Sequence, residues 1–266
     1  MRSPVRIYFI LAFGLSWGIG GIALVLGRWM PESQPFSTSN SLYYLAAYSV
    51  SFTGIALTAR YEGREGLRRL CERLIPWRSQ FRWYLTVALG YAAITGIALQ
   101  VAGLFQLTLL SLPSWSVFLH TLLFSIVRDP GPVGEEFGWR GFALPQLLKR
   151  YSPLNASLLL ALIHAAWHIP LFFIPGMPQT QVSFPFFTLG VISIAIFDTA
   201  IYFRTGANLL LAILIHLLAN VCGGIALNAH AFVIFTAAEG IIAALIVLAG
   251  GLRPTPQQVV TNSPKS

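Results

Sequence analysis

The segment that decides the fold is LNASLLLALIHAAWHIPLFFI, residues 154–174, which contains no Asp, Glu, Lys or Arg. A hydrocarbon core of roughly 30 Å takes about 20 helical residues to cross, and a helix satisfies its own backbone hydrogen bonds in lipid. We therefore predict a membrane-spanning helix here. The same run carries His164 and His168 among its apolar residues, where polar side chains are costly and mark candidate functional sites.

Comparable apolar runs recur along the chain. The clear runs are 7–26, 42–59, 84–104, 154–174, 184–203, 208–227 and 229–248, and a less regular run ends at Val127. Together they predict an all-α fold, a polytopic transmembrane helical bundle of about eight spans.

The basic residues predict the orientation of this bundle. All of the 17 basic residues except Arg28 fall in alternate connections or at the two ends of the chain. Lys and Arg collect on the cytoplasmic side of membrane proteins, so both the N-terminus and the C-terminus are expected to be cytoplasmic.

The composition excludes an ordinary soluble enzyme. Apolar residues make up 56% of the chain and charged residues only 10%, whereas soluble domains carry about 25% charged residues. The net charge of +8 follows from the orientation and from attraction to anionic lipid, so it indicates membrane lipid as a partner and gives no reason to expect nucleic acid.

The chain is expected to form one membrane-embedded helical domain, residues 1–252, followed by a disordered cytoplasmic tail, residues 253–266, that is rich in proline and small polar residues. The Arg-rich segment 60–82 has apolar residues at near-helical spacing. It is expected to lie as an amphipathic helix on the cytoplasmic surface.

Three groups of polar residues inside the apolar regions are candidates for chemistry. The first follows Asp129, an expected helix cap, and contains Glu135, Glu136 and Arg140. Glu136 and Arg140 are four residues apart and can form an ion pair on one helix face. Glu135 points about 100° away from Glu136 and is left free for chemistry, although both carboxylates could simply neutralise Arg140 and the helix N-terminus.

The second and third groups are pairs at a spacing of four. His164 and His168 share a helix face and could bind a metal or act as bases, or they could be satisfied core histidines. His216 and Asn220 also share a face, and together they can donate two hydrogen bonds to a developing oxyanion.

Four other polar residues stand alone in or near apolar runs: His120, Asp198, His230 and Glu239. For each of these we expect a structural role, satisfied by a neighbouring helix or by a position near the membrane interface.

The order and spacing of the three groups resemble the CAAX prenyl protease and bacteriocin-processing family of intramembrane proteases, also called CPBP or ABI proteins. The resemblance lies in Glu-Glu-x-x-x-Arg-Gly at 135–141, Trp-His-x-Pro at 167–170 and His-x-x-x-Asn at 216–220, and it covers roughly residues 120–225. The chain departs from the family pattern at His164, where an aromatic residue is usual.

The resemblance implies an intramembrane endopeptidase in which Glu135 and His168 activate a water and His216 and Asn220 stabilise the oxyanion. It implies that Glu136 and Arg140 support Glu135, and His164 is expected to be a further polar residue of the site wall. The implied partner is a membrane-associated protein or peptide substrate, and the implied location is the cell membrane, with a multi-pass topology.

The resemblance favours water activation by glutamate, with no cofactor firmly implied. A divalent metal such as zinc is also compatible with these residue types, and the expected ligands would then be Glu135, His168 and His216.

Two other classes stay open on the residues alone. A bacteriocin-immunity or scaffold protein could bind a partner in the same cavity without catalysis, although binding alone would not require the complete residue set. A proton-coupled transporter could use buried Glu and His, but no repeated half-structure is detectable in the sequence.

Overall fold

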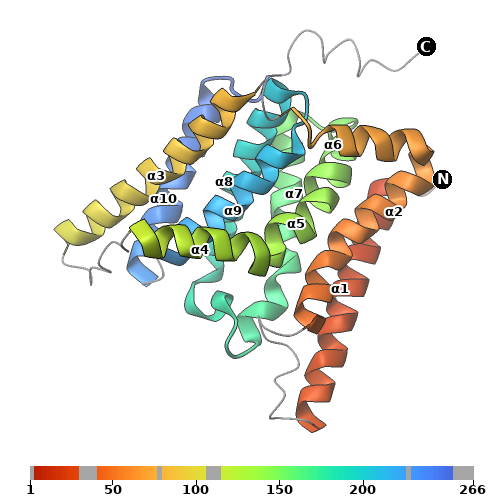
Figure 1. Ribbon diagram of the computed structural model, residues 1–266, viewed down its shortest axis with the longest axis horizontal. Coiled ribbons are helices and arrows are strands. Elements are labelled where there is room, and N and C mark those ends of the chain that lie inside the picture. Colours follow the sequence, from red (N-terminus) through yellow and green to blue (C-terminus); the bar gives the residue numbers. More distant parts are fainter. Residues whose placement is uncertain (1–2, 30–40, 77–79, 106–114, 226–228, 254–266) are drawn as a thin grey trace.

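The computed structural model describes residues 3–29, 41–76, 80–105, 115–225 and 229–253, and Figure 1 shows them as a bundle of helices. The described residues contain helices and no strand. In chain order these are α1 (Pro4–Trp29), α2 (Ser41–Glu72), α3 (Phe81–Leu104), α4 (Trp115–Arg128), α5 (Pro130–Glu136), the π-helix η2 (Phe137–Ala143), α6 (Leu144–Leu148), α7 (Pro153–Trp167), the 3-10 helices η3 (Ile169–Phe173) and η4 (Pro178–Gln181), α8 (Phe184–Thr205), α9 (Leu209–Ile225) and α10 (Ala229–Leu248). The predicted all-α polytopic bundle is confirmed.

Six helices in the described residues are long and apolar enough to cross a membrane: α1, α2, α3, α7 with η3, α8 and α10. The other two predicted spans correspond to α4, with 14 residues, and α9, with 17 residues. At 1.5 Å per residue these helices are about 21 and 26 Å long, shorter than a typical hydrocarbon core. The count of eight spans and the cytoplasmic orientation of the ends therefore stay predictions.

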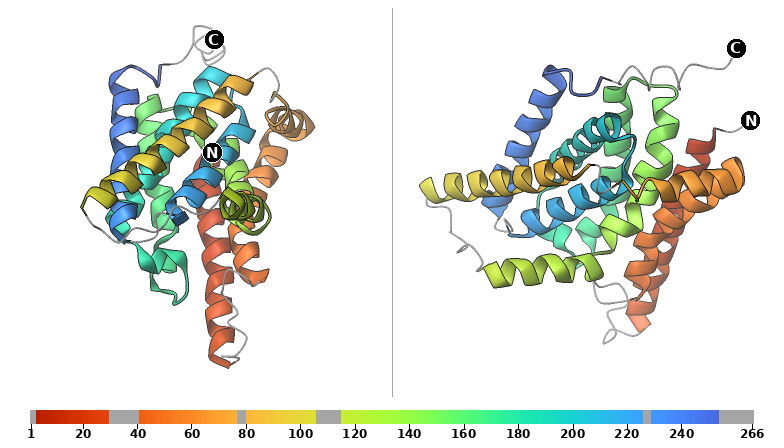
Figure 2. Two further views of the ribbon diagram at one scale, coloured as in Figure 1. Left: turned by 60° about the vertical axis from the view of Figure 1, so that its left-hand side comes forward. Right: turned by 45° about the horizontal axis from the view of Figure 1, so that its top comes forward.

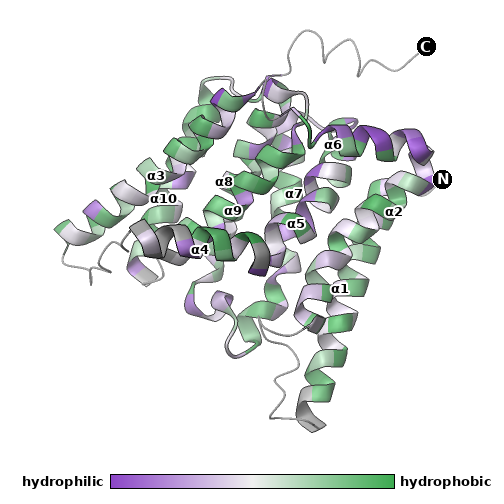
Figure 3. Ribbon diagram, in the orientation of Figure 1, coloured by the Kyte–Doolittle hydropathy of each residue, from purple (hydrophilic) through white to green (hydrophobic). Residues whose placement is uncertain are grey.

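The Arg-rich segment continues α2 as a second helical piece. Gly63 has φ 63° and ψ −157° and kinks the helix, so the piece after it turns away from the apolar part of α2 (Figure 1). Figure 3 shows this piece as the most hydrophilic part of α2. Arg68 forms ion pairs with Glu65 and Glu72 on its exposed face. The helix predicted at residues 60–82 is thus present up to Glu72.

Two hydrophobic cores flank the middle of the bundle. One is built from α3, α8, α9 and α10 and contains Tyr91, Leu211 and Phe235. The other is built from α1, α2, η2, α6 and α7 and contains Tyr8 and Trp139. The short helix α5 contacts both α2 and α9, and the two views in Figure 2 place it between these helix groups. Polar residues on α5 therefore lie inside the bundle.

Many large apolar side chains are exposed on the outer surface, and Figure 3 shows that α1 and α3 consist mostly of hydrophobic residues. Ile10, Leu89 and Leu245 are each more than half exposed. Such side chains are stable on a surface that faces lipid, and the chain is accordingly a multi-pass membrane protein.

A close backbone contact holds η2 against α2. A Cβ atom at Gly138 would lie 2.5 Å from the carbonyl oxygen of Val50, and one at Gly54 would lie 2.8 Å from the Cα of Gly138. Side chains at these positions would force the helices apart, so two glycines fix how closely the helix that carries the glutamates approaches α2.

The disordered tail predicted at 253–266 falls, except for Arg253, outside the described residues, and so does the side chain of Arg28.

Candidate active site

The helix that carries the two glutamates begins at Asp129. Its side chain accepts a hydrogen bond from the backbone N–H of Gly131 at 3.0 Å, and Pro130 follows at the first helical position. Both features favour a helix start, as the sequence predicted. After Glu136 the chain continues as the π-helix η2, a wide turn that is found mostly at functional sites.

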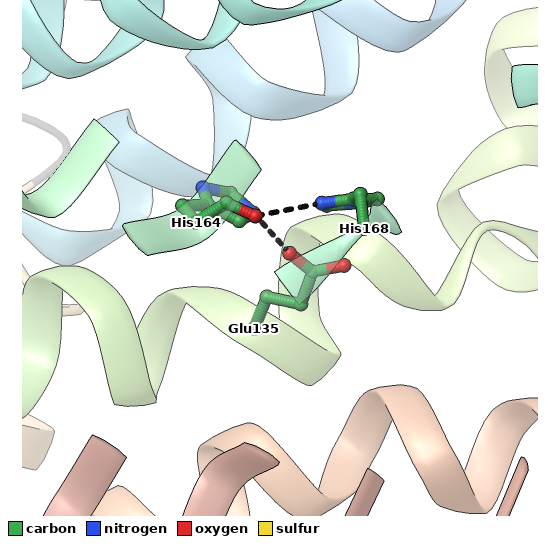
Figure 4. A group of neighbouring side chains, drawn as sticks. All are labelled: Glu135, His164 and His168. Carbon is green, nitrogen blue, oxygen red and sulfur yellow. Dashed lines mark hydrogen bonds and ion pairs between the residues drawn. The ribbon is translucent and has the colours of Figure 1, made fainter. Parts of the chain in front are cut away.

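Glu135 and two histidines of α7 form a buried cluster. Glu135 Oε2 lies 2.8 Å from His164 Nε2 and accepts a hydrogen bond from the indole N–H of Trp139 at 3.2 Å. Figure 4 shows the carboxylate of Glu135 directed at His164 and His168. Glu135 is only 4% exposed, so its charge depends on these few polar neighbours.

His168 is oriented by the end of α7. Pro170 cannot continue an α-helix, since it lacks an N–H group and restricts the residue before it; α7 ends at Trp167 and a 3-10 turn follows. His168 Nδ1 lies 3.1 Å from the carbonyl oxygen of His164. Because a carbonyl only accepts, Nδ1 carries the proton, and the neutral ring keeps the lone pair of Nε2 for another partner.

A buried chain of charges links four helical elements behind this cluster. Glu136 Oε1 accepts from Arg140 Nη1 at 2.6 Å, which confirms the predicted ion pair, and it lies 2.7 Å from His216 Nδ1 on α9. The other end of the guanidinium of Arg140 pairs with Asp198 on α8 at 2.7 Å. Glu136, Arg140 and Asp198 are each at most 3% exposed, so each charge is tolerated only because it is paired.

Asn220 and His216 converge above the N-terminus of α5. Asn220 Nδ2 donates to Asp129 Oδ2 at 2.7 Å, which uses one N–H of the amide and leaves the other. A Cβ atom at Gly131 would lie 3.0 Å from His216 Nε2 and 3.3 Å from Asn220 Nδ2. His216 Nε2 and Asn220 Nδ2 therefore lie close to each other and pack directly against Gly131.

Two cavities meet at Glu135. The larger one, about 470 Å³, is lined by residues of all three predicted groups, among them Glu135, His168, His216 and Asn220. A smaller one of about 260 Å³ lies between α1, α2 and α7 and is lined mainly by apolar residues. Tyr43, Glu135 and His168 line both.

The structure thus brings together every residue proposed for the site: Glu135, Glu136, Arg140, His164, His168, His216 and Asn220. His164 was expected only as a polar residue of the site wall, but it contacts Glu135 directly. Asn208, a polar residue about three turns before Asn220, lies outside this cluster: its side chain accepts a hydrogen bond from the backbone N–H of Leu211 at the start of α9 and donates one to Gln80.

Two contacts between side chains of the site were not predicted from the sequence. Asp198 was expected to be satisfied by a neighbouring helix, which is correct, but its pairing with Arg140 was not foreseen. Asp129 was expected to cap α5 and also holds Asn220. The pairing of Asp198 could have been predicted, because an unpaired Asp in an apolar span is energetically costly and requires a cation from another helix.

One group of side chains in the described residues has ligand atoms close enough to hold a metal ion. Glu135, His164 and His168 offer atoms that all lie within 4.8 Å of one another. His216, which was expected in such a set, instead contacts Glu136. One carboxylate and two imidazoles are a donor set that zinc accepts.

Known proteins match the part of the sequence that forms this site. Residues 130–222 match the family described as Type II CAAX prenyl endopeptidase Rce1-like. The chain is also 31% identical, over 122 residues, to a protein of Methanococcus maripaludis named CAAX prenyl protease 2, an alignment that covers 43% of this chain and 45% of that protein.

The matched region 130–222 contains all the residues of the three polar groups, while the chain aligns with less than half the length of its curated relative. Over this region the chain is similar to the Rce1-like CAAX prenyl endopeptidases, as the motif pattern predicted.

Proposed function

We propose that the chain is an intramembrane endopeptidase of the CAAX-processing type, which hydrolyses a peptide bond in a membrane-associated protein or peptide of the cell membrane. The observation that carries the proposal is the arrangement around the larger cavity. A carboxylate with an adjacent imidazole lines the same cavity as two nitrogen donors that converge on one point. These are the groups that peptide hydrolysis requires.

Glu135 is the general base in this proposal. The carboxylate takes a proton from a water molecule as the oxygen attacks the scissile carbonyl, and it gives this proton to the amine nitrogen as the C–N bond breaks. His168 Nε2 accepts the second hydrogen bond of the water and orients it. His164 and Trp139 hold Glu135 Oε2 in place. Pre-positioning of this kind removes much of the entropic cost of bringing water and substrate together.

His216 and Asn220 form the oxyanion site. The carbonyl oxygen of the scissile bond is placed in the larger cavity, where His216 Nε2 and Asn220 Nδ2, which lie close together beside Gly131, can both donate to it. His216 donates through both ring nitrogens as the imidazolium, and the Glu136 carboxylate beside Nδ1 compensates its charge. Each donor of such a site is worth about 3 kcal/mol in the transition state.

The two cavities provide room for substrate on both sides of the reacting groups. A peptide that passes Glu135 and His168 would place one part in the cavity of about 470 Å³ and the other in that of about 260 Å³. The substrate reaches this depth from the membrane, because apolar side chains surround the bundle. Membrane lipid is thus the chain's immediate partner, and nucleic acid has no role.

A metal-assisted variant of the mechanism would use Glu135, His164 and His168. A bound ion would polarise the water or the carbonyl. His164 Nε2 and Glu135 Oε2 are at hydrogen-bond distance, 2.8 Å, whereas two ligands of one tetrahedral zinc are about 3.3 Å apart. This spacing favours direct activation of water by Glu135.

The experiment is cleavage of a mixed fluorogenic peptide library by the purified protein in detergent. The wild type is compared with Glu135→Ala and with Glu65→Ala, a control on the exposed face of α2, each with and without a chelator. We expect cleavage by the wild type and by Glu65→Ala, none by Glu135→Ala, and survival of activity with the chelator. Cleavage that the chelator abolishes would instead support the metal-assisted variant. A wild type that is as inert as Glu135→Ala would favour a binding or immunity protein.

A further inference from the structure

A second carboxylate lines the larger cavity and takes no part in the proposed mechanism. Glu239 lies in the middle of α10 and is 1% exposed. Its side chain lines the same cavity as Glu135 and His168.

Glu239 has no ion-pair partner among the described residues, unlike Glu135, Glu136 and Asp198. Its Oε1 atom is buried without a hydrogen bond of normal geometry, and the polar contact of its carboxylate is with the hydroxyl of Tyr91. Arg140 is occupied by Glu136 and Asp198. Arg128, a cation in the cavity lining, stacks on the ring of Phe124 at 4.7 Å.

The wall around Glu239 is shaped to leave space beside the carboxylate. Gly190 on α8 faces it, and a Cβ atom there would lie 3.5 Å from Glu239 Oε2 and 3.4 Å from Thr236. The Thr236 hydroxyl is directed at backbone carbonyls of its own helix. A group that enters this end of the cavity would therefore lie beside the carboxylate of Glu239, on the side of Oε2.

An unmet acceptor in an apolar wall costs free energy, which a donor from outside can recover. Leaving a buried polar group without a partner is unfavourable, and a hydrogen bond to a charged group is stronger than a neutral one. An apolar side chain in this position would leave Glu239 unsatisfied, whereas an ammonium or a carboxamide would satisfy it. This is the asymmetry that gives binding sites with polar groups their selectivity.

We infer that Glu239 is a specificity-determining residue, which binds a hydrogen-bond-donating side chain of the substrate, an ammonium or carboxamide group, in the part of the cavity between α8 and α10. That the bound peptide is a substrate rests on the proposed function. The selectivity itself is a property of binding and does not need the bond to be cleaved.

A structural role of Glu239, as a partner of Tyr91 on α3, is the competing explanation for its burial. The Tyr91 hydroxyl is also buried without a hydrogen bond of normal geometry, yet it lies close enough to Glu239 to act as a hydrogen-bond partner of the carboxylate. A purely structural Glu239 would pair with Tyr91 after a small rotation. Its loss would then lower the stability of the protein without altering any preference among ligands.

The test uses three versions of a fluorescent peptide taken from those that the wild type cleaves, or, if none is cleaved, a peptide with a CAAX-type C-terminus. They carry Lys, Gln or norleucine, unbranched side chains of similar length, at each position in turn around the scissile bond. Binding is measured by fluorescence anisotropy with the Glu135→Gln protein, which retains the cavity.

At one position, we expect the Lys and Gln peptides to bind about tenfold more tightly than the norleucine peptide, since one charged hydrogen bond has that effect. Adding Glu239→Met, which keeps an unbranched shape and removes both oxygens, should abolish or reverse this preference. Adding Glu65→Gln, on the exposed face of α2, should leave it unchanged. Tyr91→Phe should also leave it unchanged.

Equal binding of the three peptides at all positions, or a preference that survives Glu239→Met, would overturn the inference. The proposed function fails separately: it fails if the wild type cleaves none of these peptides, whatever they bind. A preference for Lys and Gln without cleavage would keep this inference and reject the protease, and cleavage without preference would do the reverse.

Discussion

Gly131→Ala offers a sharp test of the oxyanion site, because the added methyl group would press on both nitrogens proposed to bind the substrate oxygen. The new Cβ atom would lie 3.0 Å from His216 Nε2 and 3.3 Å from Asn220 Nδ2. At these distances the methyl group would displace the two nitrogens from the positions in which they donate to the substrate oxygen. Neither nitrogen loses a protein partner, because the bonds to Glu136 and Asp129 are made by other atoms or other N–H groups.

The structural cost of Gly131→Ala is small compared with its expected kinetic effect. Contacts of 3.0–3.3 Å require shifts of only a few tenths of an ångström, at a cost of about 1 kcal/mol, and Ala regains up to about 1 kcal/mol of helix propensity. Loss of an oxyanion donor costs about 10²–10³ in kcat. We therefore expect kcat to fall by about 10², with KM and the melting temperature nearly unchanged.

The assay is steady-state cleavage of one peptide from the library, with thermal unfolding measured on the same samples. Gly90→Ala is the matched control, since a Cβ atom at Gly90 meets nothing within 4 Å. A double-mutant cycle adds specificity: if both changes act on one oxygen, Gly131→Ala should cost much less in an Asn220→Ala background. A Gly131→Ala variant with wild-type kcat, or one whose effect is fully additive with Asn220→Ala, would refute the role given to these two nitrogens.

Three further changes test the framework of the site. Gly138→Ala should lower the melting temperature by several degrees and reduce cleavage, because its Cβ atom would lie 2.5 Å from a backbone oxygen of α2 and overpacking costs about 1–3 kcal/mol; equal stability of Gly138→Ala and Gly90→Ala in thermal unfolding would contradict this. Asp198→Leu should destabilise the protein by about 3–5 kcal/mol, since it leaves Arg140 with one carboxylate in a buried position, and Asp198→Asn should cost less; denaturant unfolding of the two variants checks the order. Arg73→Met should cost about 2–4 kcal/mol in the same assay, because the guanidinium donates to the backbone carbonyls of Ala207, Gly141 and Arg140; an unchanged unfolding curve would show that these bonds are not needed to hold α2 against η2.

The sequence predicted the parts of the structure that depend on local pattern. Apolar runs without charge gave the helices, and Asp129 with Pro130 gave the start of α5. The spacing of four gave the pair of Glu136 and Arg140. These features follow from helix geometry and from the cost of charge in lipid, so a single segment contains the information.

The remaining features depend on segments that are distant in sequence. Asp198 meets Arg140, and Asn220 meets Asp129, only because α8 and α9 pack against α5 and η2. The contact of His164 with Glu135 likewise needs α7 to lie beside α5. The π-helix after Glu136 was also not predicted, since residues 137–143 read as an ordinary helix and the wide turn accompanies the close contact with α2. Helix packing, which no local pattern encodes, sets these partners.

The measurement that tests the central claim most directly is peptide cleavage in water enriched in ¹⁸O, with the products analysed by mass spectrometry, for the wild type and for Glu135→Gln. If Glu135 activates a water, the wild type forms two fragments from one internal peptide bond, and the new carboxyl group carries one ¹⁸O atom. Glu135→Gln, which keeps the shape of the side chain and loses the base, forms neither fragment at a measurable rate. Formation of the labelled fragments by Glu135→Gln at the wild-type rate would contradict the account, because the water would then be activated by another group.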